Sequence, residues 1–228
     1  MGLFITFEGG DGSGKTTQAH LLHHRLQQLA ALKDKEVILV HEPGGTAFGE
    51  QVAEMMRRKR LLRELYRTWV ASDVWTGLNP LAELFLFAAS RAQLVSEVIC
   101  PHLEKSHIVI CDRFTDSTLA YQGYGRGLEP DTIEAVNEIA TSGLHPDLTI
   151  LLDLEVEAGL ARVRSSRRIE PFERESTAFH QRVREGYLKM AAADPKRWFV
   201  VDAMSPQQQI GGLIWERVLT LLCEKGYG

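Results

Sequence analysis

Short apolar runs recur along the chain, each separated from the next by a longer segment of mixed polarity. The runs are rich in β-branched residues, show no alternation of polar and apolar positions, and occupy residues 3–8, 37–40, 108–111, 148–152 and 199–201. Strands that are buried on both faces of a parallel sheet have this continuous apolar character. The pattern therefore predicts a five-stranded parallel sheet.

The segments between these runs carry the spacing of amphipathic helices. After the first run, for example, Leu22, Leu26 and Leu29 recur at helical intervals. Helices are expected at residues 18–30, 48–67, 80–103, 130–142, 155–165, 177–193 and 206–223. Because helices that join parallel strands form right-handed crossovers, the chain is predicted to be one α/β domain over residues 1–228, with helices flanking the sheet.

Composition narrows the class of protein. The 228 residues are 44% hydrophobic and 25% charged, which is ordinary for a globular protein, and the net charge of -4 argues against a dedicated nucleic-acid binder. The three cysteines are far apart and are interpreted as reduced thiols. There is neither a signal peptide nor an apolar run that spans a bilayer, so the expectation is a cytoplasmic protein with no nucleic-acid or membrane partner.

A glycine-rich segment follows the first predicted strand and opens the first predicted helix. It reads GGDGSGKT over residues 9–16 and matches the P-loop pattern. Glycines let the backbone wrap around phosphate oxygens, and the amide groups and helix N-terminus attract their charge. Lys15 adds a cation for the β- and γ-phosphates, and the hydroxyl of Thr16 can bind Mg²⁺. The residues predicted to bind ATP are Gly9, Gly10, Asp11, Gly12, Ser13, Gly14, Lys15, Thr16 and Thr17.

The third predicted strand ends in Asp112 followed by Arg113. An acidic side chain at this strand tip can hold Mg²⁺ or its water ligands, and the adjacent arginine can reach a phosphate. A P-loop alone does not identify the reaction, since kinases, GTPases and motor ATPases share it. The chain contains no Asn-Lys-x-Asp motif for guanine and no apolar strand that closes on Asp-Glu, which disfavours the last two classes.

Four motifs together resemble the bacterial thymidylate kinases. They read EGGDGSGKTT at residues 8–17, HEPGGT at 41–46, LFLFAASR at 84–91 and DRFTDSTLAYQG at 112–123. The resemblance runs over nearly the whole chain, in the family's order and spacing. It implies a P-loop NTPase fold, transfer of a phosphoryl group from ATP with Mg²⁺ to dTMP, and a homodimer that uses the helix at 80–103 and its neighbours.

The resemblance also implies the acceptor site. Asp11 matches the residue that binds the sugar 3′-hydroxyl of dTMP, Phe87 the aromatic residue that stacks on thymine, and Arg91, one helical turn on, the side chain that hydrogen-bonds the base. Arg113 matches the arginine that engages the acceptor phosphate. The other matching positions, around the base, sugar and monophosphate, are Glu42, Pro43, Ser117, Thr118, Tyr121 and Gln122. The residues by themselves leave open that Phe87 is a core residue and Arg91 a surface residue.

An arginine-rich lid is expected at about residues 160–175. Position 12 is glycine, so the P-loop cannot supply the arginine that stabilises the transferring phosphoryl group, and the resemblance places this arginine in the lid. An ungapped match puts the family's Asp-Arg pair on Glu170 and Pro171, and proline cannot act in this way. The candidates are Arg168, then Arg167, with Arg162 and Arg164 of the preceding helix also open. The predicted catalytic residues are Lys15, Arg113 and Asp11, together with one of these candidate arginines.

Three alternatives to a dTMP kinase stay open from the sequence. The first is a related kinase for another nucleotide or a nucleoside. The second is a regulatory or assembly ATPase whose arginine-rich segment binds nucleic acid, and the third is an inactive homologue, which Pro171 keeps open. The stretch 57–79 is longer than is typical of the family; its basic part is interpreted as a solvated helix face or an edge of the dimer.

Overall fold

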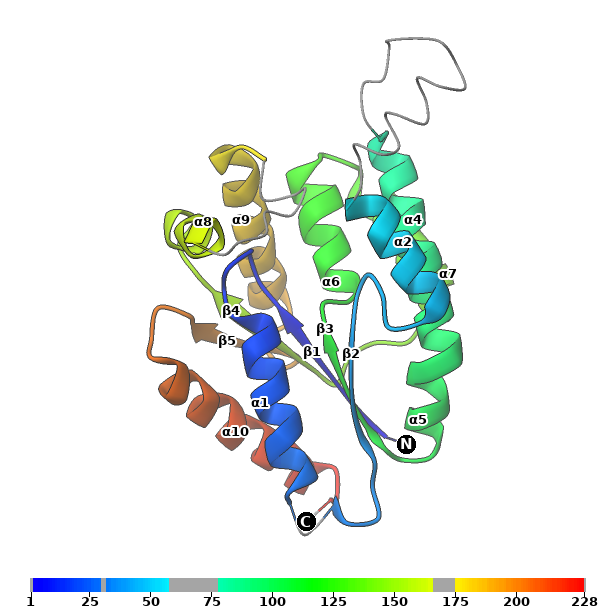
Figure 1. Cartoon of the computed structure of the whole chain (residues 1–228), viewed down its shortest axis with the longest axis vertical. Helices are drawn as coiled ribbons and strands as arrows, with labels where there is room; N and C mark the ends of the chain where they lie inside the picture. Colours follow the sequence, from blue (N-terminus) through cyan, green and yellow to red (C-terminus); the bar gives the residue numbers. More distant parts are fainter. Residues whose placement is uncertain (1, 30–31, 58–77, 166–174, 228) are drawn as a thin grey trace.

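Five parallel strands form one sheet in the order β2-β3-β1-β4-β5 (Figure 1). The computed structural model describes residues 2–29, 32–57, 78–165 and 175–227. The strands are β1 (Leu3–Glu8), β2 (Val37–His41), β3 (Ile108–Asp112), β4 (Leu148–Asp153) and β5 (Trp198–Asp202). The predicted parallel sheet is confirmed, and each predicted strand lies within one residue of the observed bounds at either end.

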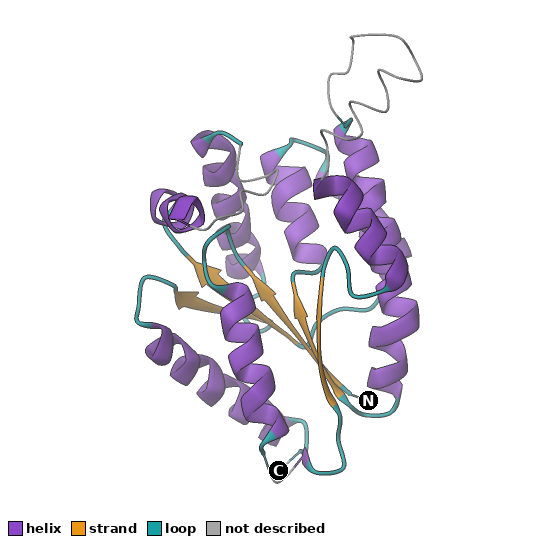
Figure 2. Ribbon diagram, viewed as in Figure 1, coloured by secondary structure: helices purple, strands orange, loops and turns teal. Residues whose placement is uncertain are grey.

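Helices connect the strands (Figure 2). They are α1 (Lys15–Gln27), α2 (Ala47–Arg57), α4 (Pro80–Leu94), η2 (Val95–Ile99), α5 (Cys100–Glu104), α6 (Thr115–Thr118), η3 (Leu119–Gly125), α7 (Pro130–Thr141), α8 (Val156–Ser165), α9 (Thr177–Ala193) and α10 (Gln207–Glu224). The part of the helix predicted beyond residue 57 lies outside the described residues. Helix α6 and the π-helix η3 were not predicted as helical; they continue directly from the tip of β3.

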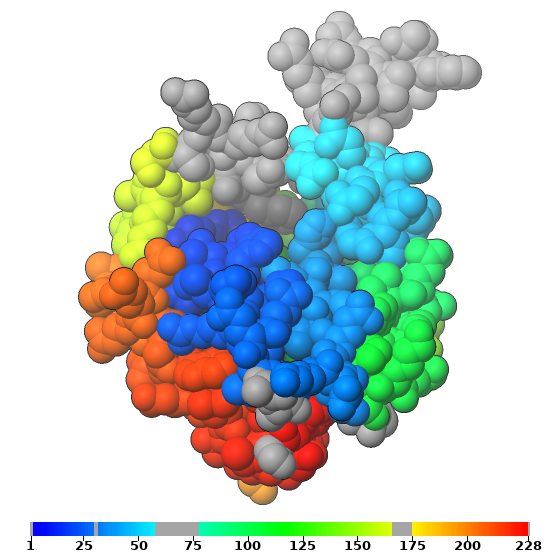
Figure 3. Space-filling model, turned by 60° about the horizontal axis from the view of Figure 1, so that its bottom comes forward, coloured from blue at the N-terminus to red at the C-terminus, as the bar shows by residue number. Residues whose placement is uncertain are grey.

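Apolar side chains fill both faces of the sheet, which explains the continuous apolar runs. On β1, Ile5 and Phe7 belong to the cluster beneath α1 and α10, whereas Phe4 packs into the cluster beneath η2 and α5. Helices α1 and α10 lie side by side on their face, in blue and red in Figure 3. A third cluster places η3 and α9 on β4 and β5. The result is a sheet between two helical layers.

The connections after β1 and β3 leave the sheet in opposite directions. The chain passes from β1 through α1 to β2, and from β3 through α6, η3 and α7 to β4, although β1 and β3 are direct neighbours. Ligands of open α/β sheets bind where neighbouring connections diverge in this way, outside the carboxyl ends of the strands. The P-loop after β1 and the Asp112-Arg113 pair at the carboxyl end of β3 flank this position.

One helix differs from the expectation that no segment could cross a bilayer. The continuous helix Pro80–Glu104 is long and apolar enough for a membrane span by length and composition alone. In the fold, however, it buries Leu84, Leu94 and Ile99 and packs against α2, α7 and β3. Contacts within the protein therefore account for part of its apolar character, and 39% of its apolar stretch is buried.

Candidate active site

The P-loop presents the free N-terminus of α1. Gly14 is the N-cap residue and adopts a left-handed conformation with φ 93°, which a residue with a side chain rarely adopts. As a glycine, Gly14 has no side chain with which to cap this helix end. The first amide groups of α1, which begins at Lys15 and continues through Thr16 and Thr17, are thus available to an anion. This geometry agrees with the predicted phosphate site.

Lys15 is buried inside the loop. Its Nζ donates hydrogen bonds to the carbonyl oxygen of Gly10 at 2.7 Å and to Ser13 Oγ at 3.3 Å. Burial, reinforced by the nearby Arg113 cation, lowers the pKa of Lys15 to about 8. A phosphate in the loop would therefore favour the charged form of this desolvated ammonium group, as the nearby carboxylates of Asp11 and Asp112 also do.

Thr16 and Asp112 meet across the crevice between β1 and β3. The hydroxyl of Thr16 donates to Asp112 Oδ2 at 2.5 Å. The other carboxylate oxygen, Asp112 Oδ1, is buried and has no hydrogen-bond partner among the residues that the structure describes. A hydroxyl beside an unpartnered carboxylate oxygen is a donor set that suits a hard cation such as Mg²⁺.

Arg113 is held in a strained conformation between the P-loop and η3. Its φ is 72°, in the left-handed region that bulky residues seldom occupy, and its amide donates to the carbonyl of Phe7 at 3.0 Å. Nη2 donates to Asp11 Oδ1 at 2.7 Å and to the hydroxyl of Tyr121 at 3.2 Å. Nη1 lies 3.3 Å from the carbonyl oxygen of Gly9. The guanidinium is thus fixed next to the position where phosphates would lie.

Asp11 is ionised at neutral pH. Burial alone would raise the pKa of its carboxyl group, but Arg113 and Lys15 outweigh burial and hold the pKa below its usual value. Oδ1 also accepts a hydrogen bond from the hydroxyl of Tyr121 at 2.9 Å. Oδ2 is buried, has no hydrogen-bond partner in the described part of the chain, and lies 4.0 Å from Nδ1 of His180. A carboxylate with one free oxygen can accept a hydrogen bond from a sugar hydroxyl.

One cavity of about 1040 Å³ joins the predicted acceptor residues. All of the predicted substrate-binding residues line it, namely Asp11, Glu42, Pro43, Phe87, Arg91, Arg113, Ser117, Thr118, Tyr121 and Gln122. Thr16 and Asp112 line the same cavity and so connect it to the P-loop. Residues from the ends of β1, β2 and β3 and from α4 and η3 therefore converge on a single space of a size that suits a nucleotide.

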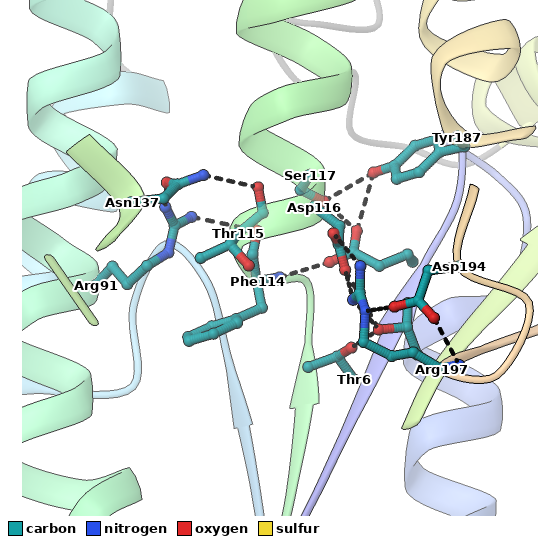
Figure 4. Close-up of polar contacts among 12 residues, drawn as sticks. Thr6, Arg91, Phe114, Thr115, Asp116, Ser117, Asn137, Tyr187, Asp194 and Arg197 are labelled. Carbon is teal, nitrogen blue, oxygen red and sulfur yellow. Dashed lines mark hydrogen bonds and ion pairs between the residues drawn. The ribbon is translucent and has the colours of Figure 1, made fainter. Parts of the chain in front are cut away.

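Arg91 is one of the most buried side chains of the protein. It ion-pairs with Glu42 Oε2 at 2.7 Å and donates to Asn137 Oδ1 at 2.7 Å and to Thr118 Oγ1 at 2.8 Å. Figure 4 shows it reaching toward Asn137, which in turn bonds the backbone of Thr115. The alternative of a surface arginine is therefore wrong, and Phe87 is half-buried at the cavity wall rather than in the core.

Glu8 was not singled out from the sequence as a site residue. It is fully buried at the end of β1 and accepts hydrogen bonds from the hydroxyls of Ser117 and Tyr187 and from the amide of Phe114. The available signal was an acidic residue that ends an otherwise apolar strand. Its partner Tyr187 lies 179 residues away in the chain, beyond any local pattern.

Helix α8 follows β4, contacts the P-loop and begins before the predicted lid in the chain. A Cβ atom at Gly12, whose φ is 75°, would lie 2.4 Å from the carbonyl oxygen of Gly159, so the two backbones touch. Arg162 donates to the carbonyl oxygens of Gly12 at 3.3 Å and Ala203 at 3.1 Å. Arg164 is exposed. The preferred candidates, and the proline that replaces the family's arginine, lie outside the described residues: Arg167, Arg168 and Pro171.

Known proteins resemble the chain over nearly its whole length. A family model described as thymidylate kinase matches residues 7–214. The thymidylate kinase of Dehalococcoides mccartyi (strain 195) is 46% identical over 222 residues, which cover 97% of this chain and 98% of that protein. That of Geobacter sp. (strain M21) is 46% identical over 222 residues, covering 95% and 91%. The crystal structure of thymidylate kinase from Ehrlichia chaffeensis has a TM-score of 0.71 and 33% identity, covering 95% of this chain and 98% of that one.

Proposed function

The chain belongs to the thymidylate kinase family, and on this premise we propose that it transfers the γ-phosphoryl group of ATP to the phosphate of dTMP, giving ADP and dTDP. The observation that carries the proposal is a cavity that adjoins the P-loop and is lined by every residue expected to contact dTMP. An acceptor bound there would present its phosphate to Arg113, next to the phosphates of ATP.

Positioning and charge neutralisation account for catalysis in this proposal. Lys15 and the N-terminus of α1 hold the β- and γ-phosphates of ATP, and Arg113 holds the acceptor phosphate. Thr16 and Asp112 would hold Mg²⁺, which supplies positive charge at the phosphate oxygens when bound. The acceptor is already an anionic phosphate, so the reaction needs no strong general base. Arg168, or else Arg167, would complete the neutralisation from the lid.

Tyr121 supports selectivity for a deoxyribose. Its hydroxyl donates to Asp11 Oδ1, and the Arg113 guanidinium lies 5.0 Å from the centre of its ring. The ring is therefore fixed rather than free to withdraw. A ribonucleotide would place a 2′-hydroxyl against it, which is a steric means of rejecting the wrong sugar.

An assay of ADP release across several acceptors tests the proposal. The panel is dTMP, dUMP, dCMP, AMP and thymidine, each with Mg²⁺ and with EDTA in its place. We expect dTMP to give the highest kcat/KM, and turnover to stop when EDTA removes the metal. A better acceptor than dTMP would indicate a different kinase, ATP hydrolysis that is indifferent to dTMP would indicate a regulatory ATPase, and no turnover would indicate an inactive homologue.

We also propose that the enzyme is a cytoplasmic homodimer. Helices α2 and α4 pack against each other and expose Phe48 and Phe85, which are 46% and 53% accessible. Large apolar side chains on neighbouring helices provide a surface that a second copy can cover. Sedimentation equilibrium should give twice the 25.6 kDa chain mass. A monomer at micromolar concentration would contradict the proposed dimer but not the proposed kinase activity.

The proposed cytoplasmic location rests on the cysteines. The free thiols of the three cysteines suit a reducing compartment, and cell fractionation can check the location of the protein.

A further inference from the structure

The carboxyl group of Glu8 contacts three groups that adjoin Arg113, and it does not line the cavity. Glu8 Oε1 accepts the amide hydrogen of Phe114, the residue after the strained arginine, at 2.8 Å. Glu8 Oε2 accepts from Ser117 Oγ at 2.5 Å and from the hydroxyl of Tyr187 at 3.0 Å. In Figure 4, Tyr187 of α9 points toward Ser117, and their oxygens are 2.8 Å apart. Glu8 does not touch the guanidinium itself.

The two hydroxyls link Glu8 to the arginine side chain. Arg113 Nη1 lies 3.1 Å from Ser117 Oγ and 3.5 Å from the hydroxyl oxygen of Tyr187, and it can only donate to them. When Glu8 is ionised, both hydroxyls donate to Oε2 and their lone pairs face Arg113. When Oε2 carries a proton, it must donate to one of these hydroxyls, whose own hydrogen then turns toward other neighbours, among them the arginine donor. Only the ionised carboxylate orients both hydroxyls to accept from Arg113.

The surroundings of Glu8 shift its pKa so that the carboxyl group changes its ionisation near neutral pH. Burial and the negative charge of Asp116 raise the pKa of Glu8 to about 7, against the opposing effects of Ser117, Arg113 and the Phe114 amide. Asp116 is itself paired with Arg197, with Nη1 2.6 Å from Oδ2, as Figure 4 shows. The titratable and charged groups that face Glu8 are Arg113, Asp116, Lys15, Cys111 and Tyr187.

We propose that Glu8 is a positioning residue for the acceptor phosphate: its carboxylate holds the backbone after Arg113 and orients the two hydroxyls that accept from the guanidinium. This inference rests on the proposed dTMP kinase activity. It assigns a role to a buried acid that contributes no atom to the cavity wall. The role requires charge and not only size, so it distinguishes Glu8 from a residue that merely fills the core.

Glu8→Gln tests the proposal because the amide keeps the size but donates through Nε2, as a protonated carboxyl group would. At pH 8 we expect kcat/KM for dTMP to fall about 10- to 100-fold, the range for losing a hydrogen bond to a charged group, with KM for ATP unchanged. At pH 6 the gap between wild type and variant should shrink to a few-fold. The phosphate of dTMP also titrates near pH 6, but equally for both proteins, so their difference reports Glu8.

Unfolding provides a second readout of the same ionisation. The raised folded-state pKa means that folded Glu8 still binds a proton at pH values where the unfolded side chain has released it. The stability of the wild type relative to Glu8→Gln should therefore fall as pH rises from about 5 to 8. Urea unfolding at both pH values measures this difference.

Tyr187→Phe is the matched variant, since it removes one hydroxyl and keeps the buried ring that packs on Trp198. It should raise KM for dTMP less than Glu8→Gln does and keep the wild-type pH dependence. If Glu8→Gln does not fold, Tyr187→Phe decides, and a kcat/KM for dTMP within twofold of wild type overturns the proposal. So does a Glu8→Gln enzyme with a wild-type pH profile, or one that loses ATP and dTMP efficiency equally. Failure of the wild type to use dTMP would instead refute the proposed function.

Discussion

Replacement of Lys15 with alanine is expected to lower phosphoryl transfer by about three orders of magnitude while leaving the fold intact. The ammonium group is the cation inside the loop that would follow the γ-phosphoryl group through the transition state, and loss of one such donor commonly costs a factor of about 100 to 1000. Because Lys15 is buried with a lowered pKa, its removal relieves the cost of a desolvated charge. Single-turnover rates measure the loss, and near-normal turnover would contradict the mechanism.

Two further variants separate charge from packing. Lys15→Met keeps the aliphatic stem and should be as inactive as the alanine variant, whereas Lys33→Ala, at an exposed position, should be fully active.

The pH dependence of unfolding adds an independent check on Lys15. Folded Lys15 releases its proton near pH 8, but the unfolded side chain keeps its proton to higher pH. Wild-type stability should thus rise between about pH 8 and pH 10, and Lys15→Met should lack this rise.

Arg91→Ala is expected to lower the free energy of unfolding by about 3–5 kcal/mol, in addition to raising KM for dTMP. The substitution leaves Glu42 buried without its cation, and removal of one partner of a buried ion pair has effects of this size. Burial already raises the pKa of Glu42, and Arg91 opposes the rise. The variant should therefore lose stability, relative to wild type, as the pH rises above the usual value for a glutamate. Urea unfolding at pH 5 and pH 8 tests this sign.

Glu42, the partner of Arg91 in the ion pair, provides the control. Glu42→Gln in the Arg91→Ala background removes the uncompensated charge, so the double variant should recover part of the lost stability. Phe87→Ala would remove the proposed stacking on the base without removing a charge. It should raise KM for dTMP by about 5- to 150-fold, as expected for loss of about 1–3 kcal/mol of base stacking. If Arg91→Ala were as stable as Phe87→Ala, the structural role of the ion pair would be refuted.

The sequence predicted the sheet and the acceptor residues for different reasons. The strands were recognisable because both faces of β1 are buried, so that Phe4 and Ile5 are apolar although they point to opposite layers. Phe87 and Arg91 were recognisable by their spacing of one helical turn within a familiar motif. Both signals are local. Helix α6 and η3 were missed because their sequence is rich in Ser, Thr and Gly, and because the packing of η3 against α9 joins segments that are distant in the chain.

The partners of buried polar side chains could not be predicted, because they come from distant segments. Arg91 meets Glu42 across 49 residues, and Asp116 meets Arg197 across 81. Arg113 likewise has a positive φ that its own sequence does not favour, and its guanidinium contacts Asp11 and Tyr187 from distant segments of the chain. The motifs predict that Arg91 and Arg113 bind ligand, but only the fold shows the hydrogen bonds that each makes to other segments of the protein.

The contact between Gly12 and Gly159 limits how this protein can be re-engineered. A grafted arginine at position 12, intended to act from the P-loop in place of the lid, would have its Cβ pressed against a main-chain carbonyl that no rotamer change can move. The reverse also holds, since a side chain at Gly159 would meet the carbonyl oxygen of Asp11 at 2.5 Å. A single substitution therefore cannot move the arginine from the lid to the P-loop. The P-loop and helix α8 would have to be replaced together.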